Sequence, residues 1–261
     1  MIRFFISPHP TFGNYKKPVK WKVEASPYFW WWYALTLNEE YRRLCERMEG
    51  VAEIEIKGKG VRARKLQVYK DFGDVRYTGD RYVAFYNWWR NRVNTNETRG
   101  EYLFAEPVIA GKVEVLADET AAVEAVRDSE RVVISIPLNR QRQHVDRVID
   151  RILKKNLKME KGRKVKDPSN SKARYKLTKS VQVESLRKAF LVYDEKNQAK
   201  DIKQSISNKE IAERSNIKLN FRNTDLEMND DQNRNRVISA TVSRYLRIAN
   251  QKINKSNSGF F

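Results

Sequence analysis

The chain has 261 residues, and 52 Lys and Arg against 33 Asp and Glu give it a formal net charge of +19. One cysteine excludes an internal disulfide and a zinc ribbon, and two histidines leave little material for a metal site. No apolar run approaches the roughly 18 residues of a membrane span, and the start lacks a secretory signal. The sequence therefore predicts a soluble cytoplasmic protein whose partner is a polyanion, most commonly a nucleic acid.

The positive charge is concentrated in the second half of the chain. Residues 1–130 hold 21 basic and 19 acidic side chains, whereas residues 131–261 hold 31 and 14. All six tryptophans lie within the first 90 residues. This asymmetry predicts a nearly neutral, aromatic folding unit followed by the part that faces the polyanion.

Two helices are expected near the start of the chain. Ser26 is a good N-cap because Pro27 follows it at the first helical position, and the helix would continue to Leu37. Asn38 is a second N-cap, followed by an apolar residue at every third or fourth position. The run Trp30–Trp32 has no interleaved cations, so we expect it to pack in the core rather than to stack on bases.

A hairpin and a further helix are expected next. Apolar and charged residues alternate over 52–56 and glycines follow, which predicts a strand whose return arm begins at Val61. Asp80 then begins a helix with an aromatic face. The residues on that face are Tyr82, Phe85, Trp89 and Val93.

The middle of the chain predicts a small α/β unit. Residues 112–116 and 131–138 have the composition of strands, and 118–127 between them is a short Ala-rich helix. Asn139 then caps a long helix with an apolar face and a basic face. The apolar residues are Val145, Val148, Ile149, Ile152, Leu153 and Leu157.

A basic linker is predicted over residues 158–180, which show no apolar period. Residues 151–180 hold 12 basic and 2 acidic side chains. Cations beside a DNA-binding module usually contact phosphate. The predicted phosphate contacts are Lys154, Lys155, Lys158, Lys161, Arg163, Lys164, Lys166, Lys172 and Arg174.

The last 80 residues predict a helical DNA-binding domain of the helix-turn-helix kind. A helix over 183–198 precedes a short helix capped by Ser207 or Asn208, in which Ile211-Ala212 is a small buried contact. The segment 218–231 is longer than the turn of the compact motif. A third helix, 234–254, has an apolar back formed by Ile238, Val242, Tyr245, Leu246, Ala249 and Ile253.

The front of this third helix has the side chains that major-groove recognition requires. Arginine bonds guanine bidentately, Asn and Gln bond adenine, and small residues permit close approach. The predicted DNA contacts are Asn208, Lys209, Arg234, Arg236, Ser239, Thr241, Ser243, Arg244, Arg247 and Gln251.

An enzyme is not expected. The acids Glu53, Glu55, Asp71 and Asp74 are candidates for a Mg²⁺-dependent nuclease, but strand alternation explains the first two as solvent-facing. No nucleophile lies beside a base in a recognisable pattern. The sequence predicts no catalytic residue, no metal and no cofactor.

Several short stretches carry a family resemblance. They are residues 26–32 with Leu35, Asn38 and Tyr41, then 69–75, Trp88, Trp89, 103–107 and 241–246. Together they resemble proteobacterial transcriptional-regulator-like, helix-turn-helix proteins of phages and integrative mobile elements. The resemblance implies a DNA-binding protein of a bacterial or phage-infected bacterial cell.

The predicted architecture is α+β with three parts. Residues 1–157 form an aromatic-rich mixed domain for oligomerisation or partner contact, 158–180 the basic linker, and 181–261 the all-helical DNA-binding domain. The predicted function is sequence-specific binding of double-stranded DNA by a regulator, with homodimer formation left open. Two alternatives also remain open: a plasmid or phage replication initiator or partition protein that binds origin DNA, and a non-specific nucleic-acid-binding accessory protein.

Overall fold

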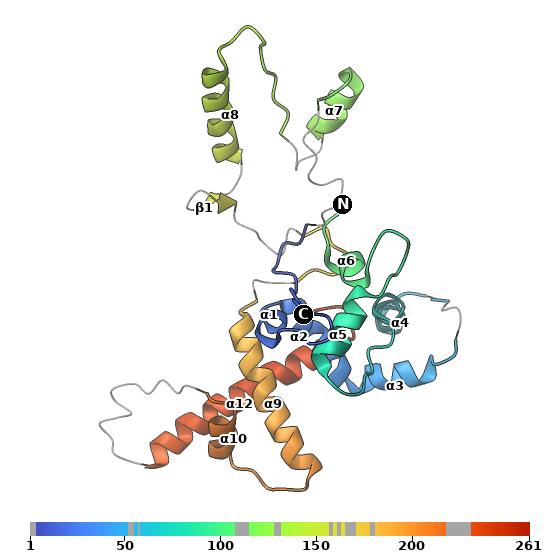
Figure 1. Ribbon diagram of the computed structural model, residues 1–261, viewed down its shortest axis with the longest axis vertical. Coiled ribbons are helices and arrows are strands. Elements are labelled where there is room, and N and C mark those ends of the chain that lie inside the picture. The colour runs from blue at the N-terminus through green and yellow to red at the C-terminus, as the bar shows by residue number, and fades with distance from the viewer. Residues whose placement is uncertain are drawn as a thin grey trace. The chain divides into compact units, whose positions relative to one another are not determined.

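A computed structural model gives the fold (Figure 1). It describes residues 4–51, 55–56, 58–107, 115–127, 132–156, 159–160, 163–164, 171–177, 181–217 and 231–261. The chain divides into two compact units: residues 1–106 with 168–261 form unit 1, and residues 107–167 form unit 2.

Helices dominate both units. In unit 1 they are α1 (Lys20–Glu24), α2 (Pro27–Leu37), α3 (Glu39–Arg47), α4 (Val61–Phe72), α5 (Arg81–Arg90), α6 (Arg99–Phe104), α9 (Val183–Asp201), α10 (Asn208–Arg214) and α12 (Asp231–Ser256). Unit 2 contains α7 (Glu119–Arg127), α8 (Arg142–Asn156), β1 (Met159–Glu160) and β2 (Arg163–Lys164). The two short strands pair antiparallel, with Met159 opposite Lys164.

The predicted α+β class is therefore wrong. Among the described residues the only paired strands are β1 and β2, each two residues long, and the fold is helical. The expected return arm at Val61 is instead the first turn of α4, where good helix formers precede Val68 and Phe72, buried one turn apart. Of the strand expected over 52–56, residues 52–54 lie outside the described part and Glu55 and Ile56 form no strand.

The two strands expected in the middle of the chain are also corrected. Residues 112–114 and 131 lie outside the described part, and neither 115–116 nor 132–138 is in a strand. Val132 and Ile136 are 44% and 45% exposed, so this apolar run is not the buried sheet element that its composition predicts. A strand requires a hydrogen-bonded neighbour, and the described residues supply none here. Helix α7 follows the prediction, whereas α8 begins at Arg142, so Asn139 is not its N-cap.

Helix α2 is the centre of unit 1. Ser26 caps it by accepting a hydrogen bond from the Tyr28 amide, and every residue from Pro27 to Thr36 is buried. Because the helix is apolar on all sides, it must be surrounded by other elements. The prediction that Trp30–Trp32 pack in the core is confirmed: all three side chains are fully buried.

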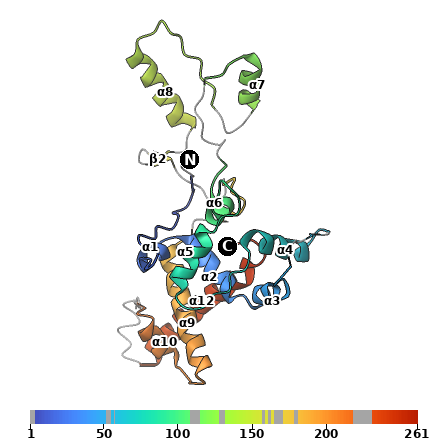
Figure 2. The same cartoon turned by 45° about the vertical axis from the view of Figure 1, so that its right-hand side comes forward.

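Helix α9 joins the C-terminal helices to this aromatic core, and it lies against α12 in both views (Figure 1, Figure 2). Phe190 stacks on Trp30 with a centroid distance of 5.3 Å and an interplanar angle of 10°. Asp194 accepts hydrogen bonds from the Tyr33 hydroxyl and the Arg81 guanidinium, both at 2.7 Å. The N-terminal and C-terminal helices thus share one core.

Residues 171–177, expected within a linker, also pack into unit 1. Tyr175 is buried, its hydroxyl donates to Asp71 at 2.8 Å, and its amide donates to the Leu103 carbonyl. The observed division, 1–106 with 168–261 apart from 107–167, differs from the predicted one, because these long-range contacts bring the two ends of the chain together. The rest of the expected linker is described only at β1 and β2.

Candidate nucleic-acid interface

Helix α12 presents one buried and one exposed face, as the sequence predicts. Val242 and Ala249 are fully buried, and Ile238, Tyr245 and Ile253 are at least nine-tenths buried. These side chains pack against α9, α10 and α2. The apolar stripe therefore determines which side of α12 faces the solvent.

The short helix α10 supports α12 as expected. Ser207 caps α10 in a capping box with Glu210, and Ile211 and Ala212 are buried. Asn216 ends this segment with a φ of 48°, the left-handed conformation that asparagine tolerates. Residues 218–230 lie outside the described part, and α12 begins at Asp231.

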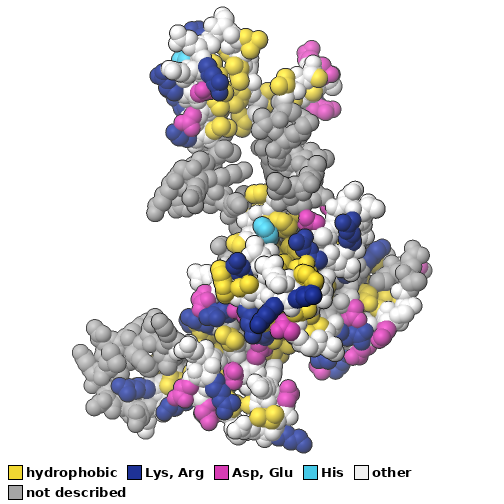
Figure 3. Space-filling view, in the orientation of Figure 1, with side chains coloured by type: hydrophobic (Ala, Val, Ile, Leu, Met, Phe, Trp, Pro, Cys, Tyr) yellow, Lys and Arg dark blue, Asp and Glu magenta, His cyan; other side chains and the backbone are white. Residues whose placement is uncertain are grey.

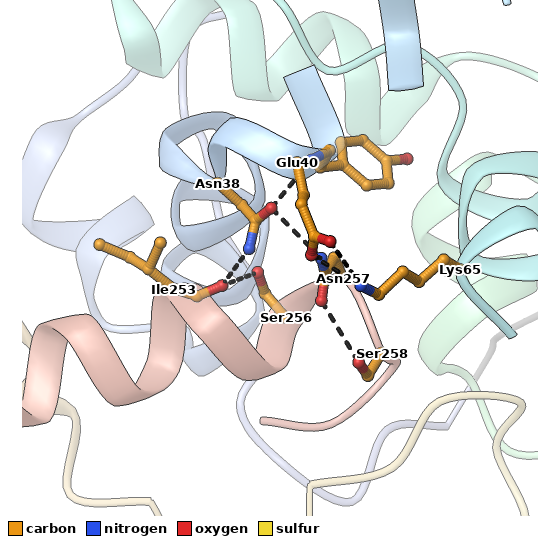
Figure 4. Close-up of polar contacts among 8 residues, drawn as sticks. Asn38, Glu40, Lys65, Ile253, Ser256, Asn257 and Ser258 are labelled. Carbon is orange, nitrogen blue, oxygen red and sulfur yellow. Dashed lines mark hydrogen bonds and ion pairs between the residues drawn. The ribbon is translucent and has the colours of Figure 1, made fainter. Parts of the chain in front are cut away.

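The other end of α12 is anchored by a polar network (Figure 4). Asn38, the N-cap of α3, donates to the Ile253 carbonyl at 2.6 Å and accepts from the Tyr41 amide at 2.8 Å. Asn257 donates to Glu40 at 2.7 Å, and Lys65 donates to the same carboxylate. These bonds from Lys65 and Asn257 lower the pKa of Glu40.

Most of the predicted DNA contacts lie on the surface, and those of α12 lie away from its apolar stripe. Helix α12 contains six cations and a single acid, Asp231. By contrast, Figure 3 shows Lys and Arg mixed with Asp and Glu over α9 and α10. The exposed residues are Lys209, Arg234, Arg236, Ser243, Arg244, Arg247 and Gln251, and the half-buried ones are Asn208, Ser239 and Thr241.

The predicted phosphate contacts are scattered. Lys154 and Lys155 are exposed on α8 in unit 2, and Lys172 is exposed in unit 1. Arg174 lies 3.7 Å from Asp71 and its guanidinium lies 4.3 Å from the Tyr102 ring centroid, so part of its charge is already engaged. Lys158, Lys161 and Lys166, and the side chains of Arg163 and Lys164, lie outside what the structure describes.

The structure adds a groove that the sequence did not indicate. A hollow of about 1060 Å³ lies between the start of α4 and the end of α12. A second hollow of about 730 Å³ runs along α12 from Ser243 and shares Gln251, Asn254 and Lys255 with the first. The exposed face of α12 therefore leads directly into the groove.

Four cations line this groove, and none of the side chains that line it is acidic: the cations are Lys59, Arg64, Lys252 and Lys255. Within the described residues, none of the four forms an ion pair. Lys252 is half-buried, and burial together with the neighbouring charge of Lys255 lowers its pKa. Helix periodicity predicts that Lys255 lies on the same face of α12 as Arg247. Lys59 and Arg64 line the groove only because α4 packs near the end of α12, which the sequence does not indicate.

The acidic residues considered for a nuclease have structural contacts. Asp71 accepts hydrogen bonds from Tyr175 and Gln67, and Asp74 pairs with Arg76. Glu55 is exposed and is separated from Asp71 and Asp74 by more than a dozen residues of sequence. Glu53 lies outside the described part. Among the residues that the structure describes, no cluster of His, Cys, Asp or Glu has the composition of a metal site.

No family model, curated protein or solved structure matches this chain. Within the described part of the chain, no helix has both the length and the apolar character to cross a bilayer.

Proposed function

We propose that this protein binds double-stranded DNA through the exposed face of α12, as a sequence-specific regulator of a phage or mobile element. The observation that carries the proposal is the surface of α12 itself. Its exposed side combines arginines, Gln251 and small residues, without an acidic side chain beyond Asp231, on a helix held by a buried stripe.

The chemistry of this face suits the major groove of DNA. Arg244 and Arg247 are exposed and one turn apart, the spacing at which two guanidinium groups reach neighbouring base pairs. Ala240 and Ser243 lie beside them and are small enough to let the helix approach the base edges. Gln251 adds an amide group that can bond adenine in a bidentate manner.

Rigid support of α12 favours specific recognition. A side chain discriminates between bases only when its backbone is held in one position, and α12 packs against three helices along its length. The cations Lys154 and Lys155 of α8, exposed in unit 2, are proposed as further contacts to phosphate, which increase affinity without reading sequence.

The proposal is tested by selecting bound sequences from a random DNA pool and then measuring affinity for the enriched site. We expect Arg244→Ala with Arg247→Ala to weaken this binding at least about 30-fold, because each bidentate contact contributes about 1–3 kcal/mol. The matched control is Arg42→Ala with Arg90→Ala, which removes two exposed helical arginines from α3 and α5.

The result has three clear readings. Enrichment of one sequence, with loss only in the α12 variant, supports the proposal. Equal loss in both variants, or a steep salt dependence with no enriched sequence, indicates non-specific binding by charge. Absence of DNA binding at low salt contradicts the proposed function.

A further inference from the structure

The groove between α4 and the end of α12 has a composition that a duplex contact does not require. Apolar groups line part of it, among them Ile56, Val61 and Ala63, whereas the four cations provide its charge. A phosphate requires only the cations. A wall with apolar and aromatic groups instead suits a planar, weakly polar group attached to an anion.

One exposed aromatic ring, that of Phe260, gives this groove a stacking surface. Phe260 is 42% exposed, and the Arg64 guanidinium lies 4.8 Å from its ring centroid. Phe261 is buried, and the Lys252 ammonium lies 4.4 Å from its ring centroid. Exposed aromatic rings beside cations are the combination with which proteins hold unpaired bases and their phosphates.

The groove is also in line with the proposed DNA-binding face. Gln251, Asn254 and Lys255 line both hollows, so a strand that follows α12 past Arg247 enters the groove without leaving the protein surface. A paired base inside a duplex is stacked on its neighbours and does not present its face to a side chain. A strand that ends or opens at this point does present it.

We propose that this groove binds an unpaired nucleotide of the DNA held on α12, with the base stacked on Phe260 and the phosphates on Arg64, Lys252 and Lys255. The inference rests on the proposed function, because α12 must bring the DNA to the groove. It adds a substrate class: duplex DNA with a single-stranded end or an opened segment next to the recognised site.

The test measures fluorescence anisotropy of labelled DNA at one salt concentration. The probes are the enriched duplex with blunt ends and the same duplex with a single-stranded extension of about six nucleotides, placed on each strand and at each end in turn. We expect one extension to raise affinity at least about 5-fold, since stacking of one base contributes about 1–3 kcal/mol.

The variant that distinguishes this groove is Phe260→Ala. It should abolish the gain from the extension and leave the affinity for the blunt duplex unchanged, and Phe260→Tyr should restore the gain. The matched control is Trp21→Ala, because Trp21 is also an exposed aromatic ring, 69% exposed, with a cation 5.5 Å from it. This control should keep the full gain.

The outcomes separate this inference from the proposed function. If no extension raises affinity, or if Phe260→Ala retains the gain, the proposed nucleotide site is contradicted. The affinity for the blunt duplex would still support DNA binding by α12. If Arg64→Ala reduces affinity for both probes equally, the groove contacts duplex phosphate and the inference is overturned. If the blunt duplex does not bind at all, the proposed function itself fails.

Discussion

Helices α8 and α12 have the same sequence pattern but different surroundings. Each combines an apolar stripe with a face rich in cations. In α12 the stripe is buried against three helices, and Val242 and Ala249 have no exposed surface. In α8 the corresponding residues are half-buried at best, and Leu153 is 36% exposed. Periodicity thus predicts a helix and its apolar side, but not whether another element covers that side.

The comparison also concerns how each unit is stabilised. Burial of one aliphatic side chain contributes about 1.5–3 kcal/mol, and α12 buries several such side chains. In the described part of unit 2, Ala125 is the only buried apolar residue. We therefore expect unit 1 to depend strongly on the stripe of α12 and to be indifferent to the stripe of α8.

The largest expected effect is on the stripe itself. Ile253→Ala should lower the free energy of unfolding of unit 1 by about 3 kcal/mol, because it leaves a cavity in a packed core. Ile149→Ala, the matched change in α8, should alter it by less than about 0.5 kcal/mol. Urea unfolding followed by tryptophan fluorescence measures this, since all six tryptophans lie in unit 1. A loss for Ile149→Ala as large as that for Ile253→Ala would contradict the comparison.

A smaller effect is expected where α12 ends. Asn38→Ala removes both the donor to the Ile253 carbonyl and the N-cap of α3, and should cost about 2 kcal/mol in the same urea experiment. Ser207→Ala removes only an exposed cap of α10 and should cost about 1 kcal/mol. Equal losses in the two variants would show that Asn38 acts as a cap alone, and not as an anchor of α12.

The smallest effect concerns the pH dependence of this anchor. Hydrogen bonds from Lys65 and Asn257 lower the pKa of Glu40 below its usual 4.5. The stability that this carboxylate contributes is therefore present above pH 4.5 and is lost as the pH falls through the lower folded pKa. Glu40→Gln should lower the unfolding free energy at pH 7 by less than about 1 kcal/mol, because the side chain is 65% exposed.

Urea unfolding at pH 7 and at pH 3 checks this sign. The difference between wild type and Glu40→Gln should shrink between pH 7 and pH 3, because a growing share of the carboxylate is protonated as the pH falls. Glu39→Gln is the control, since it removes a charge from the same turn of α3 without a hydrogen bond to the end of α12. A difference that grows on acidification would be the opposite of the expected sign.

Local signals predicted the helices well. Ser26, Asn38, Asp80 and Ser207 all cap helices by accepting backbone N–H hydrogen bonds on their side chains, as their residue types predict. The tryptophan run and the stripe of α12 are buried as expected. These features depend on neighbours within one or two turns of chain, so the sequence contains the information.

The strands and the groove depend on distant parts of the chain, and there prediction failed or was silent. The run 132–138 has a strand-like composition but no partner strand among the described residues, and Val61 begins a helix that packs through Val68 and Phe72. Lys59 and Lys255 meet in one groove only because α4 packs near the end of α12. No spacing along the sequence indicates that meeting.

Glu106 is the last residue of unit 1 before the chain enters unit 2, and it contacts residues that follow the return of the chain to unit 1. Its carboxylate accepts hydrogen bonds from the Ser171 hydroxyl at 2.5 Å and from the Lys172 amide at 2.8 Å. Glu106, before the intervening segment 107–167, and Ser171, after it, are therefore held together within unit 1. Contacts within unit 1 offset the entropy that is lost when the ends of this long segment are brought together. That entropic cost grows only slowly with the length of the segment. The segment is in effect an insertion, a place where sequence can be exchanged, shortened or added while the aromatic core and α12 keep their contacts.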